Sequence, residues 1–166
     1  MVAVRHIIIT VLVAVAGIIT FFWFFTGDEA KIKKQFKTLA ALAAKDSDEH
    51  PFMAAASARN IGDMFAETCR IEIPSHSMSK TVTRENIPAH IIAARSRYSA
   101  ISLKFHDIQI SFPEKDISRV TFTAYAETMS ASGELIREVH EFVSRMGKVE
   151  KKWYFNQIEA ISVLER

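Results

Sequence analysis

The chain has 166 residues, of which 49% are hydrophobic and 24% are charged, with only 5 glycines and 4 prolines. This composition excludes a disordered or fibrous protein, and the length suits one ordinary domain. Lysine and arginine number 21 against 19 acids, a net charge of +2, so no basic field predicts nucleic acid as a partner. The single cysteine, Cys69, excludes an internal disulfide and a multi-cysteine metal site.

An uncharged apolar stretch runs from Ile7 to Phe25. As a helix rising ~1.5 Å per residue, its 19 residues would extend about 28 Å, close to the roughly 30 Å hydrocarbon core of a bilayer. Trp23 lies near one end, where amphipathic rings favour the headgroup boundary. No good small-residue cleavage site follows Phe25, so we expect an uncleaved transmembrane anchor over residues 7–25 after a short tail, residues 1–6.

The charges beside this stretch favour two opposite orientations. Arg5 precedes it, and four lysines follow it closely: Lys31, Lys33, Lys34 and Lys37. The positive-inside rule alone would place the C-terminal domain in the cytoplasm. A short tail with one arginine is, however, typical of signal anchors, which export the domain behind them, and large domains translocate largely regardless of charge. We expect a single-pass inner-membrane protein whose soluble domain is periplasmic, with a cytoplasmic domain as the alternative.

Residues 26–166 are expected to form one soluble domain that begins with helices. In residues 28–45 the apolar side chains recur at the spacing of one helix face. These side chains are Ile32, Phe36, Leu39, Leu42 and Ala43. Pro51 suits the first turn of a second helix, which the pattern continues to about residue 67.

A short strand and a third helix are expected next. Residues 69–74 alternate like a strand, and residues 75–83 have the composition of a polar loop. Pro88 then lies in the first turn of a helix that we expect over residues 86–98. The inward-facing side chains of this helix are predicted to be Ile87, Ile91 and Ile92.

The second half of the chain has the alternation of long strands. Apolar residues alternate from Ile101 to Phe105 and again from Ile108 to Phe112, but in the opposite phase. This phase slip predicts a bulge near His106 and Asp107 inside one long bent strand. Three further strands are predicted over residues 119–131, 134–146 and 153–165. Hairpin-linked strands in succession indicate an antiparallel sheet with helices on one face, an α+β fold.

This order of elements resembles the nuclear transport factor 2-like superfamily. MFAETCRIEIP resembles its passage from helix to first strand, and TRENIPAHIIAARSRY resembles its third helix. VSRMGKVEKKWYFNQIEAI resembles its last hairpin. The resemblance covers roughly residues 28–166. It implies a cone, in which a strongly curved sheet wraps round the helices and a pocket opens between them.

The superfamily includes small-molecule enzymes, such as isomerases, dehydratases and hydrolases, and membrane-anchored binding or assembly modules. If this chain is an enzyme, the residues to test are Asp63, Tyr98 and His140. Asp63 is close to where such enzymes carry acids, although a helix-end acid is more often solvated or a cap. His140 shares a strand face with Glu138 and could line the pocket, but a cross-strand pair is the simpler interpretation.

Aromatic residues of the second half are expected to build the core, and some of them to line the mouth of the pocket. These are Phe105, Phe122, Tyr125 and Trp153. The sequence has no glycine-rich phosphate loop, and its histidines lack metal-ligand spacing, so we expect neither a cofactor nor a metal.

These observations favour a membrane-anchored binding or assembly module of a bacterial envelope. Its partners would be the bilayer, through Ile7 to Phe25, and a second copy or an envelope protein on the sheet face. The alternative is a membrane-tethered carrier or enzyme of the isomerase, dehydratase or hydrolase type. Its ligand would be a small apolar molecule held in the cone.

Overall fold

The structure is a computed structural model that describes residues 27–74 and 78–161. The predicted tail and the predicted anchor over residues 7–25 therefore lie outside the described residues. Within the described ranges, no helix combines the length and the apolar composition needed to cross a membrane. The chain divides into two units, Met1–Lys34 and Gln35–Arg166, and all the strands named here belong to the second unit.

Residues 27–74 and 78–161 contain three α-helices, as the periodicity predicts. The first includes residues 27–43. Helix α2 (Pro51–Gly62) has proline at its first position, and the Nδ1 atom of its N-cap residue, His50, accepts a hydrogen bond from the Phe52 amide at 3.2 Å. A short 3-10 turn, η2 (Arg84–Asn86), leads into helix α3 (Ile87–Arg95). On α3 the prediction of three inward isoleucines is wrong for Ile92, which is 45% exposed.

Helix α2 ends five residues before the predicted boundary, because residues 65–67 belong to a strand. Met64 and Phe65 continue the helical apolar pattern, but the last strand of the chain pairs with this segment. The Phe155 amide donates a hydrogen bond to the Met64 carbonyl at 3.0 Å, and Phe65 is in register with Phe155. Pairing with a strand ninety residues away decides the local conformation here.

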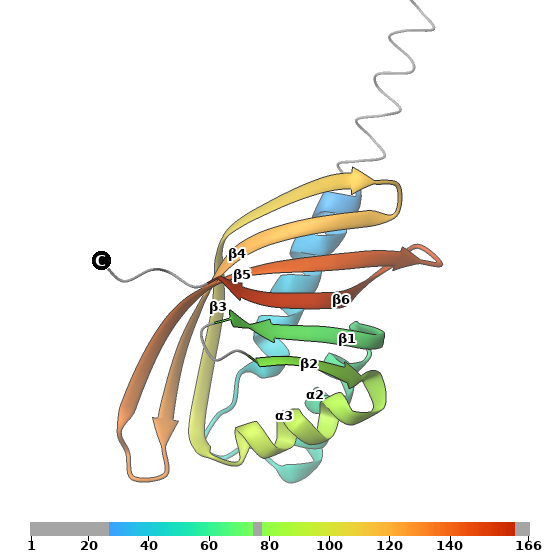
Figure 1. The fold of residues 1–166 in the computed structure, drawn as a ribbon. Helices are drawn as coiled ribbons and strands as arrows, with labels where there is room; N and C mark the ends of the chain where they lie inside the picture. The colour runs from blue at the N-terminus through green and yellow to red at the C-terminus, as the bar shows by residue number, and fades with distance from the viewer. Residues whose placement is uncertain (1–26, 75–77, 162–166) are drawn as a thin grey trace, which may run out of the picture. The chain divides into compact units, whose positions relative to one another are not determined.

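The sheet has six strands in the order β2-β1-β6-β5-β4-β3 (Figure 1). The strands are β1 (Phe65–Ile73), β2 (Met78–Thr83), β3 (Tyr98–Glu114), β4 (Ile117–Ser130), β5 (Leu135–Val149) and β6 (Lys152–Ile161). Strands β3 to β6 form the predicted antiparallel succession, but β1 pairs with β6 in parallel. The fold is α+β, and the prediction of a purely antiparallel sheet is corrected to a mixed one.

Strand β2 replaces the polar loop predicted over residues 75–83. Its residues are mostly polar because it is an edge strand, whose outer side faces solvent. Val82 is its one buried residue. Alternation of Met78, Lys80 and Val82 was the signal for a strand, but the polar residues between them gave this segment a loop-like composition.

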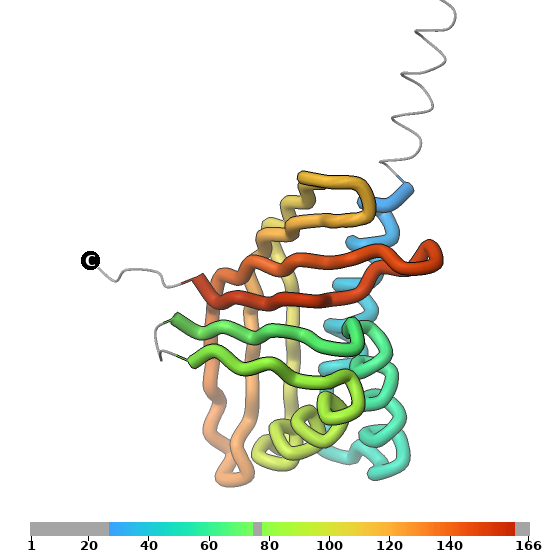
Figure 2. The backbone as a smooth tube through the Cα atoms, turned by 45° about the vertical axis from the view of Figure 1, so that its right-hand side comes forward, coloured from blue at the N-terminus to red at the C-terminus, as the bar shows by residue number. Residues whose placement is uncertain are grey.

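The predicted bulge in the long strand is confirmed. The register of β3 against β4 shifts between His106 and Gln109, and Asp107 has a φ of 53°. Aspartate tolerates this left-handed conformation better than most residues, so the sequence places the bulge at a suitable position. The bulge restores one apolar face along the whole of β3, which bends with its neighbours (Figure 2).

The core lies between the helices and one face of the sheet, here called the inner face. Phe36 is fully buried, and its ring meets those of Phe105, Phe122 and Phe155 edge-on, with centroids 4.8–5.4 Å apart. Such aromatic pairs contribute about 0.5–1.5 kcal/mol each beyond the area they bury. This cluster fixes the helix over residues 35–43 against the sheet and leaves space nearer the strands β1 and β2.

Candidate functional site

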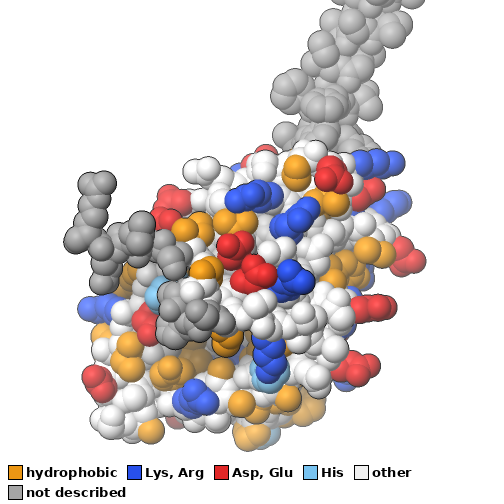
Figure 3. Space-filling view, viewed as in Figure 1, with side chains coloured by type: hydrophobic (Ala, Val, Ile, Leu, Met, Phe, Trp, Pro, Cys, Tyr) orange, Lys and Arg blue, Asp and Glu red, His pale blue; other side chains and the backbone are white. Residues whose placement is uncertain are grey.

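A cavity of about 550 Å³ lies between the helices and the strands β1 and β2. Most of the fourteen lining residues are apolar, among them Leu39, Ile61, Ile71, Ile87 and Ile101. The volume is within the range of about 300–1,000 Å³ that is usual for small-molecule sites. In the space-filling view, hydrophobic side chains gather around a recess on the lower half of the face shown (Figure 3).

The strand register decides which side chains of β1 and β2 face the cavity. Ile71 is opposite Lys80, and Cys69 is opposite Val82, so these four residues share the inner face. The alternate residues, such as Glu72, point to the other face of the sheet, here called the outer face. Lys80 is therefore the one charged residue that this pair of strands directs toward the cavity.

Arg95 lines the cavity and forms a buried ion pair beside it. Arg95, at the end of α3, is 5% exposed, and its Nη2 atom contacts both carboxylate oxygens of Glu49 at 2.5 and 2.6 Å. Its guanidinium also donates to the carbonyl oxygens of residues 42–44 at 2.8–3.1 Å. These carbonyls end the first helix, where a cation is favourable to the helix dipole. Arg95 is thus a structural clamp whose charge is paired with Glu49, while its buried Nε atom has no hydrogen-bond partner among the described residues.

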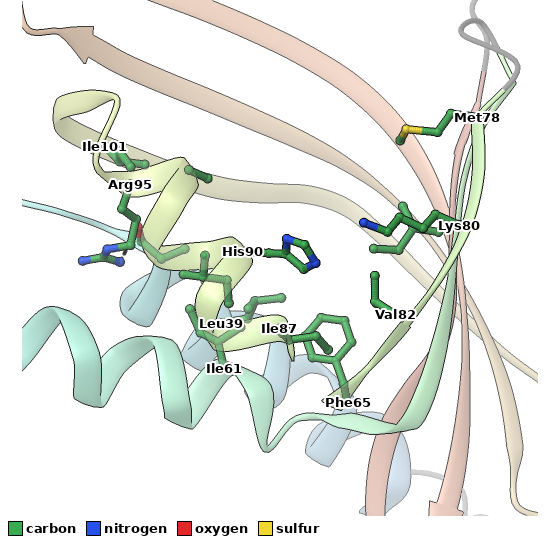
Figure 4. Close-up of a pocket in the computed structure, with 14 residues that line it drawn as sticks. Leu39, Ile61, Phe65, Met78, Lys80, Val82, Ile87, His90, Arg95 and Ile101 are labelled. Carbon is green, nitrogen blue, oxygen red and sulfur yellow. Dashed lines mark hydrogen bonds between the residues drawn. The ribbon is translucent and has the colours of Figure 1, made fainter. Parts of the chain in front are cut away.

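The mouth of the cavity carries two polar groups of a different kind. Lys80 on β2 and His90 on α3 are both exposed, and both point into the space between their elements (Figure 4). Neither side chain makes a hydrogen bond or an ion pair with another described residue. No aspartate or glutamate is among the lining residues. The described pocket is therefore apolar inside and positively charged at its mouth.

The three catalytic candidates lie apart from this cavity. Asp63 is the exposed C-cap of α2, and His140 is an exposed residue of β5 whose ring lies beside Phe142. Tyr98 begins β3, and its carbonyl oxygen accepts a hydrogen bond from Lys45 Nζ at 2.5 Å. None of the three lines the cavity. Across the described ranges, no group of three or more His, Cys, Asp or Glu side chains could hold a metal ion.

The aromatic candidates also lie outside the lining. Phe105 and Phe122 pack in the ring cluster around Phe36, and Trp153 is buried with its ring 5.7 Å from that of Phe112. Tyr125 is on the outer face, opposite Val139, and its hydroxyl donates to Glu127 at 3.1 Å. The cavity is instead lined mostly by aliphatic residues between Leu39 and Ile101, and Phe65 is the one phenylalanine among the lining residues.

Sequence reasoning did not identify Lys80 and His90 as neighbours. The signal for Lys80 was its position between Met78 and Val82 in an alternating segment. His90 lies three residues after Ile87 and four before Ala94, and both of these also line the cavity. The sequence therefore indicated that His90 shares a helix face with lining residues, but it did not indicate which strand lies opposite that face.

No family model matches this sequence, and no curated protein matches it. Solved structures do match. A nuclear transport factor 2-like protein with a cystatin-like fold from Novosphingobium aromaticivorans is 12% identical, with a TM-score of 0.65 over 86% of each chain. A candidate scytalone dehydratase from the same organism is 13% identical, with a TM-score of 0.66 over 84% of this chain and 86% of that one.

A hexachlorocyclohexane dehydrochlorinase from Novosphingobium barchaimii is 7% identical, with a TM-score of 0.61 over 82% of this chain and 86% of that one. Similarity at these identities concerns the fold, because function depends on the residues of the site. The chain has the nuclear transport factor 2-like, cystatin-like fold.

Proposed function

We propose that this chain is a membrane-tethered domain that binds a small apolar molecule in its cavity. The observation that carries the proposal is the apolar lining of a cavity large enough for such a ligand. Binding is favoured over the chemistry of the dehydratase and dehydrochlorinase neighbours, because Asp63, Tyr98 and His140 do not line the cavity. An apolar ligand would gain roughly 25 cal/mol for each Å² of apolar surface removed from water.

Filling the cavity tests this function. Ala94 lines the cavity, whereas its exposed neighbour Ala93 does not. We expect native mass spectrometry of the full chain, released from membranes, to show a bound molecule of low mass. Ala94→Phe should abolish that adduct, and the matched control Ala93→Phe should retain it. An adduct retained by both variants would show that the molecule binds elsewhere.

The tether rests on the apolar stretch from Ile7 to Phe25, and the periplasmic side is proposed with it. We expect the full chain to stay with membranes after an alkaline carbonate wash. A chain that lacks residues 1–26 should appear in the soluble fraction. Alkaline phosphatase fused after Arg166 should be active if the domain is periplasmic, and inactive if it is cytoplasmic.

A second candidate function is assembly through the outer face of the sheet. Four apolar side chains on this face are 39–58% exposed: Met129, Leu135, Val139 and Ile161. A second copy of the chain would cover them in an isologous contact. We expect cross-linking in membranes to trap a dimer that Met129→Glu removes. Met53→Glu, a control on exposed α2, should leave the dimer intact.

A further inference from the structure

We propose that the ligand is an amphiphile with one anionic head group, whose tail fills the cavity and whose head lies between Lys80 and His90. This inference rests on the proposed binding function and adds the class of ligand to it. Carboxylates and phosphate esters share the required chemistry, a compact anion on an apolar chain.

The charge at the inner end of the cavity is already paired with a carboxylate. Arg95 is the one charged side chain lining the inner end of the described pocket. Glu49 and three carbonyl oxygens occupy its Nη1 and Nη2 atoms, and its buried Nε atom has no partner among the described residues. An anion placed there would have to compete with a carboxylate whose two oxygens both contact Arg95 Nη2. The remaining inner side chains are aliphatic or aromatic, so this part of the cavity suits a hydrocarbon tail.

The mouth of the cavity, in contrast, carries a positive charge that an anionic head group could pair with. Lys80 carries a positive charge that no described acid neutralises, and the ionisable residues beside it on the strands, Arg70 and Glu72, are on the outer face. Arg70 Nη1 lies 3.5 Å from Glu72 Oε1, so these two residues form an ion pair with each other. Helix α3, which carries His90, has no acidic residue. A ligand head at the mouth therefore meets an ammonium group with three donors and an imidazole.

The polarity of the site discriminates between ligand classes. A cationic head would be repelled by Lys80, and a neutral head would gain no charge-assisted hydrogen bond from it. An anionic head gains a charge-assisted hydrogen bond at a position that water still reaches. Because Lys80 is exposed, the gain is of the size seen for exposed pairs, about 1.5- to fivefold in affinity.

Three amphiphiles with the same hydrocarbon tail distinguish the contribution of the head group to affinity from that of the tail. Decanoate, decanol and decylamine are titrated calorimetrically into the full chain in lipid nanodiscs, with empty nanodiscs as the blank. We expect decanoate to bind about 1.5- to fivefold more tightly than decanol, and decylamine to bind least tightly. Decyl phosphate is a second anionic arm. Its affinity relative to decanoate tells whether the site prefers a phosphate or a carboxylate head.

Substitutions at the mouth test whether Lys80 causes the preference for an anionic head group. Lys80→Met should bring the affinities for decanoate and decanol together, and Lys80→Arg should restore the difference. The matched control is Lys115→Met, which removes the same charge from the exposed turn between β3 and β4. We expect it to keep the preference, while His90→Gln should reduce it in part.

The head-group preference and the binding function fail in different ways. Equal affinity of the wild-type chain for decanoate and decanol would overturn the inference about the head group and leave apolar binding intact. The inference about the head group would also be overturned if Lys80→Met kept the wild-type preference for decanoate over decanol. If none of the amphiphiles binds above the nanodisc blank, or if Ala94→Phe binds them as the wild type does, the binding function itself is wrong.

Discussion

Burial governs the chemistry of Cys69. The side chain is fully buried on β1, and this burial raises the pKa of its thiol to about 11. The thiolate is the reactive species, so at pH 8 only about a thousandth of the native thiol is ionised. We expect iodoacetamide to leave Cys69 unmodified in the folded chain and to alkylate it in urea, as followed by intact mass. Rapid alkylation of the folded chain would show that the thiol is accessible.

The Glu127 carboxylate on the outer face shows how hydrogen-bond donors set protonation at a partly exposed position. Arg137 Nε at 2.8 Å and the Tyr125 hydroxyl at 3.1 Å donate to it, and these hydrogen bonds lower the pKa of Glu127. Its charge therefore persists to lower pH than that of an isolated glutamate. We expect Arg137→Met to raise the pKa of Glu127, and Tyr125→Phe to raise it less, in carbon-13 NMR titrations. An unchanged pKa in Arg137→Met would contradict the assignment to the guanidinium.

At the scale of elements, the clamp of Arg95 joins the ends of two helices. Removing the guanidinium leaves the half-buried Glu49 carboxylate and the carbonyls of residues 42–44 without their donor. Breaking a buried pair in this way typically costs about 3–5 kcal/mol. We expect Arg95→Met to lower the free energy of unfolding in urea by about 3 kcal/mol.

Arg97 provides the control for this prediction. It lies two residues further along the chain, in an exposed turn. Arg97→Met should change the free energy of unfolding by less than about 0.5 kcal/mol, as for most surface substitutions. Similar losses in both variants would mean that the clamp at Arg95 has no special role.

Elements whose pattern is local were predictable from the sequence. The phase slip at His106 and Asp107 indicated the bulge, and Pro51 indicated the start of α2, because one segment alone carries each signal. The end of α2 and strand β2 were not predictable in this way. Both depend on pairing with distant or neighbouring strands, which overrides the local apolar pattern and composition.

The site was less predictable than the fold for the same reason. Its apolar helical residues, such as Leu39 and Ile87, were recognised as inward-facing, but core and cavity residues share one pattern. Phe105 and Phe122, which were expected near the pocket, also lie at inward positions of an alternating apolar pattern. Tertiary packing places these two residues in the ring cluster around Phe36. Lys80 and His90 face each other across two elements, a relation that no period along the sequence contains.

At the scale of the second unit, the topology links the two halves of the chain. Strand β6, the last in sequence, lies between β5 and β1, so the edge pair β1 and β2 is completed by the C-terminal strand. The cavity draws its lining from all three helices and from β1, β2 and β3. A ligand that fills the cavity therefore contacts both the helices and the sheet, and its binding should stabilise these elements together.

This linkage gives a prediction for thermal unfolding. Decanoate at a hundred times its dissociation constant should stabilise the folded state by about 2.7 kcal/mol through mass action. For a domain of this size, that corresponds to a rise in Tm of roughly 5–10 °C. Calorimetric scans of the full chain should show this rise as one cooperative transition, while Ala94→Phe, with its cavity filled, should show none. An equal rise in both proteins would mean that decanoate acts on the surface or on the surrounding lipid, and not through the cavity.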